Sequence, residues 1–252
     1  MLIDTHLHLD DKDYNIDEVI KRAKEKRVNY LIVSGSELSD NKFNNDLVSK
    51  YNNIFMSAGF HPCMANSFKD EDLVFLENII NSNRKVVAVG EIGLDYYYGS
   101  DNKEKQIILF RKQLDLAVKY KLPVVIHTRD AFLDTYNILK EYKLSGVIHC
   151  FSGSVETARE YISLGYYLGI GGVVTFKNSK LSNVIKEIGL DRVVLETDSP
   201  YLSPDRGNKN EPSNVRIICD YLSDLLSVDI EEVEKITSSN ARDVFDLRLD
   251  LW

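Results

Sequence analysis

The feature that most constrains this chain is an alternation of short apolar runs with amphipathic helical stretches along nearly its whole length. Residues 29–35 (NYLIVSG) and 85–90 (KVVAVG) are two of the apolar runs. Strands that are apolar at almost every position are typical of a parallel sheet covered on both faces. Eight strand–helix units within 252 residues predict an α/β fold, the (β/α)8 TIM barrel, with a doubly wound open sheet as the alternative.

Hydrophobic periodicity and turn residues place the individual elements. Strands are expected at residues 2–10, 29–35, 54–59, 85–90, 123–126, 146–148, 166–172 and 192–195. Helices are expected at residues 16–26, 39–51, 70–81, 103–120, 131–142, 154–164, 180–188 and 213–226. Residues 229–245 are expected to form one or two extra C-terminal helices packed outside the barrel. No linker divides the chain, so we expect a single domain over residues 1–252.

Composition is that of an ordinary globular protein, with 44% hydrophobic and 28% charged residues. No apolar run could span a bilayer and no signal peptide precedes Leu2, which predicts a cytoplasmic protein with no membrane partner. Cys63, Cys150 and Cys219 are far apart and form no CxxC pair, which fits a reducing compartment and disfavours a thiolate zinc site. The net charge of −8 disfavours a broad basic surface for duplex nucleic acid but permits a small, metal-screened phosphate site.

The first chemical signal is the pair His6 and His8 in the first predicted strand. Residues two apart in a strand point the same way, so the two imidazoles leave the strand side by side, as two metal ligands would. Such a pair is weak evidence by itself, because an isolated H-x-H more often reflects local hydrogen bonding. Its meaning depends on whether later strands end in partners for it.

The partners follow from the positions of all five histidines. Each lies at or just beyond the end of a predicted strand, and Glu91 and Asp198 end the fourth and eighth strands in the same way. In a (β/α)8 barrel these strand ends meet at the face that carries active sites. Surface or core histidines would scatter over helices and loops, so convergence favours a metal site. The seven residues are His6, His8, His61, Glu91, His127, His149 and Asp198.

Imidazole and carboxylate ligands together suit Zn²⁺ or Mn²⁺, whereas more carboxylate and water would suit Mg²⁺. The donor set is large enough for two divalent ions with a bridging carboxylate. Two ions roughly 3.5–4 Å apart can activate water and hold both oxygens of a displacement. The site therefore predicts hydrolysis of a phosphate ester or a related bond.

Ordered motifs along the chain carry a family resemblance. They are residues 3–8 (IDTHLH), 59–62 (GFHP), 90–96 (GEIGLDY), 126–129 (IHTR), 149–153 (HCFSG), 196–202 (ETDSPYL) and 210–212 (NEP). In these motifs the chain resembles the TatD family of metal-dependent hydrolases, within the amidohydrolase-like barrel superfamily. The motifs keep their order and cover nearly the whole chain, so the resemblance is specific.

The resemblance implies a binuclear site. His6, His8 and Asp198 would hold one ion, His127 and His149 would hold the other, and Glu91 would bridge them. Glu91 stands where some relatives in the superfamily carry a carboxylated lysine, and this difference separates the chain from those relatives.

The resemblance also implies a 3′-5′ exodeoxyribonuclease acting on DNA ends, with RNA as a further substrate. Some bacterial members of the family are linked instead to removing D-amino acids from tRNA, so a D-aminoacyl-tRNA deacylase, or another ester or amide hydrolase, is the alternative. A non-catalytic metal- or nucleotide-binding protein would be expected to lack a ligand, and this chain retains them all. The sequence predicts a monomer.

Three residues are expected to be catalytic. Asp198 would orient a metal-activated water and accept its proton, while Glu91 would bridge the ions. His61 is surplus as a ligand, so it would contact a substrate phosphate, donate a proton, or merely cap the turn set by Pro62.

Further substrate contacts are expected around the barrel mouth. Arg129 would bind a phosphate, or form a structural salt bridge with Asp130 or Asp95. Asp95 would accept a hydrogen bond from a ligand histidine, or cap a loop. Ser152 would offer a donor to phosphate near a helix N-terminus.

Loop residues beyond these leave two readings open. Lys177, Arg206 and Lys209 would follow a nucleic-acid backbone or be solvated surface charges. The tyrosines at residues 96–98 would stack on bases or simply cover the barrel mouth. Residues 203–212 resemble a shortened form of the family's Pro-rich loop, which leaves the choice of substrate open.

Overall fold

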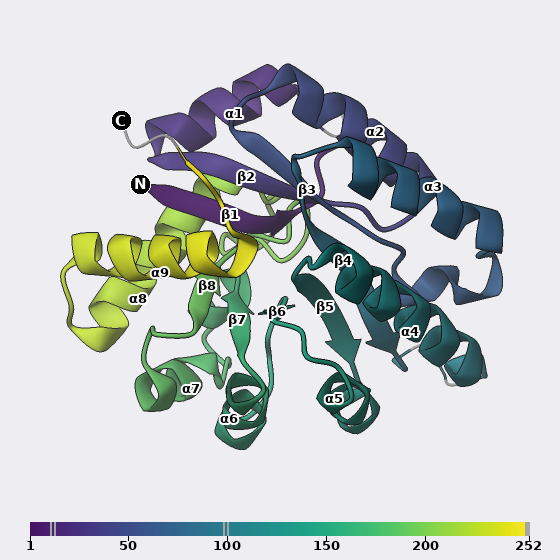
Figure 1. Ribbon diagram of the computed structural model, residues 1–252. Helices are drawn as coiled ribbons and strands as arrows, with labels where there is room; N and C mark the ends of the chain where they lie inside the picture. Colours follow the sequence, from purple (N-terminus) through teal and green to yellow (C-terminus); the bar gives the residue numbers. More distant parts are fainter. Residues whose placement is uncertain (11, 13, 98, 100, 250–252) are drawn as a thin grey trace.

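Eight parallel strands form one sheet in chain order, β1 to β8, and the helices that connect them lie around its outside (Figure 1). This computed structural model describes residues 1–10, 12, 14–97, 99 and 101–249. The expected (β/α)8 barrel is confirmed. Tyr98, one of the three expected mouth tyrosines, lies outside the described residues.

The element bounds are as follows. The strands are β1 Leu2–Leu7, β2 Val28–Ser34, β3 Ile54–Ala58, β4 Val86–Asp95, β5 Val124–Arg129, β6 Gly146–Ile148, β7 Tyr166–Ile170 and β8 Val193–Leu195. The α-helices are α1 Ile16–Glu25, α2 Leu38–Lys50, α3 Asp70–Ser82, α4 Lys103–Tyr120, α5 Phe132–Lys140, α6 Val155–Ser163, α7 Leu181–Ile188, α8 Val215–Leu226 and α9 Ile230–Phe245. Short 3₁₀ helices are η1 Pro62–Asn66, η2 Gly172–Thr175 and η3 Pro212–Asn214.

The barrel closes where the residues after β8 meet β1. The Asp198 amide donates to the His6 carbonyl at 2.9 Å, and the His8 amide donates to the Ser199 carbonyl at 2.7 Å. The Thr5 hydroxyl adds a bond to the Leu195 carbonyl at 3.0 Å. This seam brings the first and last strands together at the carboxyl end of the barrel, which is the end expected to carry the site.

Strand alternation divides the apolar residues into two cores. The larger lies between the strands and the surrounding helices. The smaller lies inside the barrel, where Ile3, Ile32, Val125, Val147 and Val194 face one another. Burial on both faces explains why the strands read as continuous apolar runs in the sequence.

The C-terminal segment corrects one expectation. Within the described residues it forms one helix, α9, whose apolar residues Ala241, Val244 and Phe245 join the interior core of the barrel. The helix does not simply lie on the outside, because the amino-terminal end of the barrel interior exposes apolar side chains that need a cover. In Figure 1, α9 lies across the end of the barrel beside β1 and β8.

Two strand ends decide where the predicted carboxylates Glu91 and Asp198 lie. Strand β4 continues to Asp95, so Glu91 lies inside the strand and not at its end. A register shift between Val89 and Ile92 interrupts its pairing with β5, and such irregularities re-aim side chains locally. Strand β8 ends at Leu195, so Asp198 lies beyond the strand, on the turn that closes the barrel.

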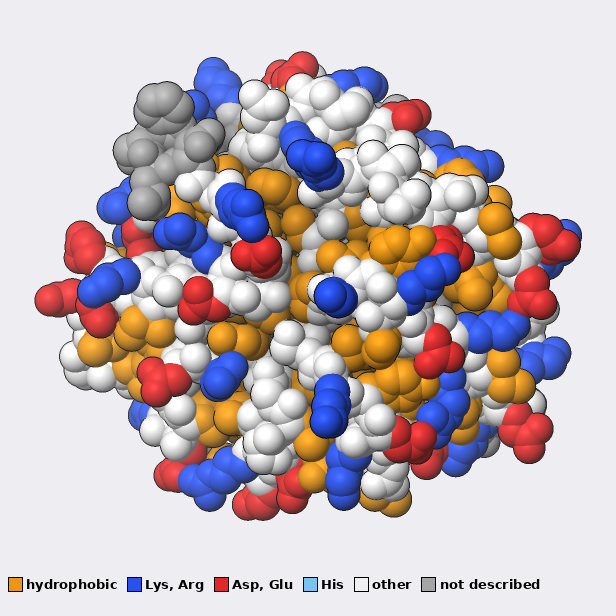
Figure 2. Space-filling view, viewed as in Figure 1, with side chains coloured by type: hydrophobic (Ala, Val, Ile, Leu, Met, Phe, Trp, Pro, Cys, Tyr) orange, Lys and Arg blue, Asp and Glu red, His pale blue; other side chains and the backbone are white. Residues whose placement is uncertain are grey.

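Lys and Arg side chains are interspersed with Asp and Glu side chains over the face seen in Figure 2. Among the described residues, none of the helices combines the length and apolar character that crossing a membrane requires.

Candidate metal centre

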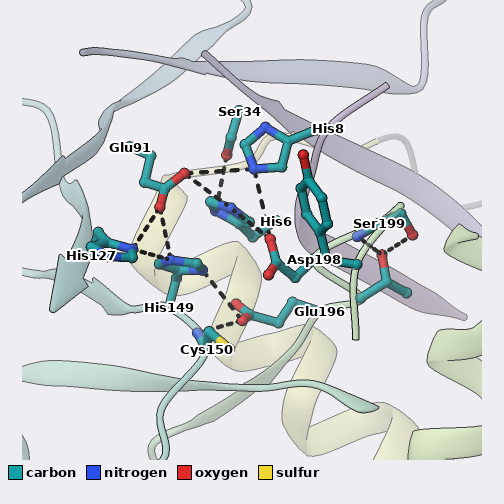
Figure 3. Close-up of polar contacts among 12 residues, drawn as sticks. His6, His8, Ser34, Glu91, His127, His149, Cys150, Glu196, Asp198 and Ser199 are labelled. Atoms are coloured by element: carbon teal, nitrogen blue, oxygen red, sulfur yellow. Dashed lines mark hydrogen bonds and ion pairs between the residues drawn. The ribbon is translucent and has the colours of Figure 1, made fainter. Parts of the chain in front are cut away.

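Side chains from strands far apart in the sequence converge at the carboxyl end of the barrel (Figure 3). His6 lies in β1, Glu91 in β4 and His127 in β5, whereas His149 directly follows β6. The structure thus brings together the residues that the sequence singled out.

Glu91 stands at the centre of this group. Its Oε2 lies 3.6 Å from Nε2 of His6 and 3.6 Å from Nε2 of His8. Its Oε1 lies 2.9 Å from Nδ1 of His127 and 2.9 Å from Nε2 of His149. Each oxygen of one buried carboxylate therefore faces a different pair of imidazoles, which is the arrangement of a bridging ligand.

Asp198 completes the first donor cluster. Its Oδ1 lies 3.5 Å from Nε2 of His6 and 3.6 Å from Nε2 of His8. Donors that hold Zn²⁺ in a tetrahedron at about 2.1 Å stand roughly 3.4 Å apart. In the first cluster, made of His6, His8, Asp198 and Glu91 Oε2, the four distances between imidazole nitrogens and carboxylate oxygens are close to that spacing.

The second donor cluster consists of His127, His149 and Glu91 Oε1. Nδ1 of His127 and Nε2 of His149 lie 3.2 Å apart. His61 lies beside this cluster, with its Nε2 3.7 Å from Glu91 Oε1 and its ring 4.4 Å from that of His127. The donor atoms of His61, Glu91 and His127 all lie within 4.8 Å of one another.

A buried atom without a hydrogen bond supports the fit to a cation. Nε2 of His6 is fully buried and has no hydrogen-bond partner among the described residues. Buried polar atoms are nearly always paired, and this one points between two carboxylates. An imidazole lone pair aimed between carboxylate oxygens suits a divalent cation such as Zn²⁺ or Mn²⁺.

Burial and charge set the acidities of the carboxylates. Burial favours the neutral form of Glu91, but the surrounding imidazoles, His149 first, hold its pKa well below its usual range. Burial dominates at Asp198 and raises its pKa to about 6, although His149 and His8 oppose the rise.

The imidazoles divide into two groups. Burial lowers the pKa of His6 well below its usual value and lowers that of His61 to about 4. Burial acts the same way at His149, but Glu91 and Glu196 outweigh it and raise its pKa well above the usual value. Hydrogen bonds to Asp95 and Glu91 likewise outweigh burial and raise the pKa of His127.

Partners on the far side of each ring orient the imidazoles. Ser34 Oγ lies 2.9 Å from Nδ1 of His6, and Asp95 Oδ2 lies 3.1 Å from Nε2 of His127. Such contacts fix which ring nitrogen carries the proton and hold the ring in place. Asp95 therefore lies where the sequence analysis placed it, as an acceptor for a ligand-type histidine. Ser34 was missed, although its position at the end of β2 is a signal that could have identified it.

A buried network missed by the sequence analysis holds Asp198. Both oxygens of Asp4 accept bonds from Thr197, from its amide at 2.9 Å and its hydroxyl at 2.6 Å. The Ser199 hydroxyl donates to the Thr197 hydroxyl at 2.6 Å. Between these residues Asp198 adopts φ of 56°, a left-handed conformation that few residues other than glycine adopt without support.

The remaining predicted residues lie around the mouth. His61 accepts a bond from the Cys63 amide through Nδ1 at 3.2 Å, so it caps η1 and also faces Glu91. The Arg129 guanidinium lies over the Tyr97 ring, 3.5 Å from its centre. Ser152 is exposed on the loop before α6, and the Ser154 side chain caps the N-terminus of that helix.

The basic loop residues do not enter the donor clusters. Arg206 lies over the Phe176 ring at 4.3 Å and Lys209 over the Tyr14 ring at 4.3 Å. Lys177 is exposed. Tyr201, which is 61% exposed, lies near the first cluster, with its ring 6.1 Å from that of His8.

Comparisons with known proteins show the family. A family model described as TatD related DNase matches residues 3–246. The uncharacterized metal-dependent hydrolase YabD of Bacillus subtilis is 41% identical over 97% of this chain and 99% of its own. YcfH of Escherichia coli, with the same description, is 37% identical over 98% of this chain and 96% of its own. The crystal structure of YjjV, a TatD homologue from Escherichia coli, superimposes with a TM-score of 0.91 at 32% identity, covering 98% of both chains.

Proposed function

Since the chain belongs to the TatD-related DNase family and is a metal-dependent hydrolase, we propose a specific activity for it. The proposed activity is that of a 3′-5′ exodeoxyribonuclease that shortens DNA ends. The observation that carries the proposal is the division of one carboxylate between two donor clusters, since Glu91 directs one oxygen to each. Paired sites of this kind serve displacements at phosphorus.

The proposed ligands follow the two clusters. His6, His8 and Asp198 would hold one ion, His127 and His149 would hold the other, and Glu91 would bridge them. Divalent ions there supply positive charge to the phosphate oxygens and lower the pKa of a bound water.

Asp198 is the proposed general base. Its side chain is 14% exposed, whereas that of Glu91 is 5% exposed, so Asp198 is the carboxylate that meets solvent at the mouth. Without a bound ion, burial raises the pKa of Asp198 to about 6, and a carboxylate positioned beside a reacting water can accept its proton in the transition state.

His61 is the proposed hydrogen-bond donor to the substrate. Burial lowers its pKa to about 4, so the ring is neutral at pH 7. Its Nδ1 accepts a bond from the Cys63 amide, and this assigns the single proton to Nε2, the atom that faces the second cluster. An N–H at this position can bind a non-bridging phosphate oxygen but cannot ligate an ion in that tautomer.

Exposed groups at the mouth support a nucleic-acid substrate. The Arg129 guanidinium lies over the Tyr97 ring, and Tyr97 and Tyr201 are 54% and 61% exposed. A guanidinium binds phosphate through paired N–H donors, and tyrosine rings stack on unpaired bases. The Tyr201 ring lies near His8 of the first cluster, and the Tyr97 amide donates to Asp95, whose other oxygen lies beside His127 of the second cluster.

The test begins with metal-stripped protein recharged separately with Mg²⁺, Mn²⁺ and Zn²⁺. Each preparation is given 5′-labelled single-stranded DNA, 3′-recessed DNA, RNA and a D-aminoacyl-tRNA, with a Glu91→Ala variant as control. A ladder of DNA products shortened stepwise from the 3′ end, and absent in the variant, is the expected result.

Release of D-amino acid without cleavage of DNA or RNA would instead assign the site to deacylation. Products that appear throughout the strand at once would contradict the exonucleolytic polarity. A monomeric state and a cytosolic location remain predictions from the sequence.

A further inference from the structure

A second buried carboxylate, outside the two donor clusters, faces the back of the His149 ring. Glu196 is fully buried, and its Oε1 accepts a bond from the Cys150 amide at 2.5 Å. The same oxygen lies 3.7 Å from Nδ1 of His149. Figure 3 shows Glu196 on the side of the imidazole away from Glu91.

Each of the two side chains has one buried polar atom without a partner. Nδ1 of His149 and Oε2 of Glu196 are both buried and have no hydrogen bond among the described residues. The 3.7 Å between Nδ1 and Oε1 is too long for a hydrogen bond. Burying a carboxylate is costly unless it is paired, so a carboxylate held here with unused acceptor capacity points to a cationic partner.

A glycine in β7 makes room for this carboxylate. A Cβ at Gly169 would lie 2.1 Å from Glu196 Oε2. Gly171, two residues further on, is different, because an added Cβ there would lie 3.6 Å from the Glu196 carbonyl oxygen, which is an ordinary van der Waals contact. Gly169 is therefore the residue whose missing side chain lets Glu196 reach the back of His149.

We propose that Glu196 is a positioning residue for the second cluster, accepting the Nδ1–H of His149 when Nε2 holds a divalent ion. The proton stays on the imidazole, and the Glu196 carboxylate supplies negative charge and orients the His149 ring. This inference rests on the metal site of the proposed function and adds a residue that acts through His149 and contacts neither ion nor substrate. Removing such an outer partner typically weakens metal binding about 10–100-fold.

The experiment measures metal binding directly. Metal-stripped wild type, Glu196→Gln, Gly169→Ala and Gly171→Ala are titrated with Mn²⁺ by calorimetry at a temperature where circular dichroism shows each to be folded. Glu196→Gln removes the charge, and Gly169→Ala displaces the carboxylate without altering it. Gly171→Ala adds the same methyl group where there is room.

The expected result is two ions per wild-type chain, with one of the two affinities reduced at least about 10-fold in both Glu196→Gln and Gly169→Ala and unchanged in Gly171→Ala. A purely structural role would lower thermal stability and leave both affinities unchanged, and this would overturn the inference. Wild-type protein that binds two ions but degrades no nucleic acid would count against the proposed activity alone. Failure of the wild type to bind two ions would overturn both.

Discussion

Replacing Thr197 by valine tests how the barrel seam holds Asp198. The change keeps the shape of the side chain and removes a hydroxyl that donates to Asp4 Oδ2 at 2.6 Å and accepts from Ser199 Oγ at 2.6 Å. The same hydroxyl accepts from the Ser199 amide at 3.2 Å. Asp4, Thr197 and Ser199 are all fully or almost fully buried.

The size of the effect follows from these contacts. Leaving a buried donor or acceptor unpaired costs about 1–3 kcal/mol, and Thr197→Val leaves both the Asp4 oxygen and the Ser199 hydroxyl without their partner. Since the two can partly rearrange, we expect the free energy of unfolding to fall by about 2–3 kcal/mol. For a chain of this size, that lowers Tm by about 4–12 °C.

The assay is urea unfolding of the metal-free protein, followed by a turnover measurement on reconstituted protein. Thr237→Val is the matched control, because the Thr237 hydroxyl is also buried but bonds only the Val233 carbonyl one turn earlier in α9. We expect the control to lose about 1 kcal/mol and no activity. Equal losses of stability and equal turnover in the two variants would refute the claim that the seam positions Asp198.

Three further predictions concern the site. Asp198→Asn is expected to keep much of the metal binding and to lower kcat by about 10²–10⁴-fold; full turnover would exclude it as the base. The raised pKa of His149 keeps the ring protonated, whereas a metal ligand must be neutral, so metal affinity should rise with pH up to that pKa. Calorimetry in buffers of different ionisation enthalpy should show the release of the proton, and an affinity that does not change between pH 6 and 9 would contradict this. In Gly93→Ala, the new Cβ would lie 1.9 Å from the His127 carbonyl oxygen, at a residue with φ of 147°. We therefore expect the free energy of unfolding in urea to fall by at least about 2 kcal/mol. A fall below about 0.5 kcal/mol would show that β4 and β5 separate easily.

The fold could be predicted from the sequence because every strand is buried on two faces. That double burial made runs such as 146–148 apolar throughout, and the structure gives this strand the expected bounds. The helix at residues 103–120 also has its expected bounds. The predicted end of β4 was wrong. Two glycines, Gly90 and Gly93, suggest a turn in the sequence, whereas in the structure they allow the neighbouring strand to approach closely.

The donor clusters could be predicted because imidazoles are scarce in this chain and all occur near strand ends. The supporting carboxylates Asp4 and Glu196 could not be predicted, since carboxylates usually occur on surfaces or in turns. Their roles depend on neighbours across the sheet, such as Thr197 for Asp4 and His149 for Glu196. Those neighbours are defined only once the barrel closes.

The most direct test of the account is anomalous diffraction from crystals of the protein soaked in Mn²⁺. We expect two anomalous peaks per chain, one among His6, His8 and Asp198 and one beside His127 and His149, with the Glu91 carboxylate between them. A Glu91→Gln variant should lose at least one peak. A single peak in the wild type, or two peaks that Glu91 does not touch, would contradict the claim that one carboxylate joins two metal sites.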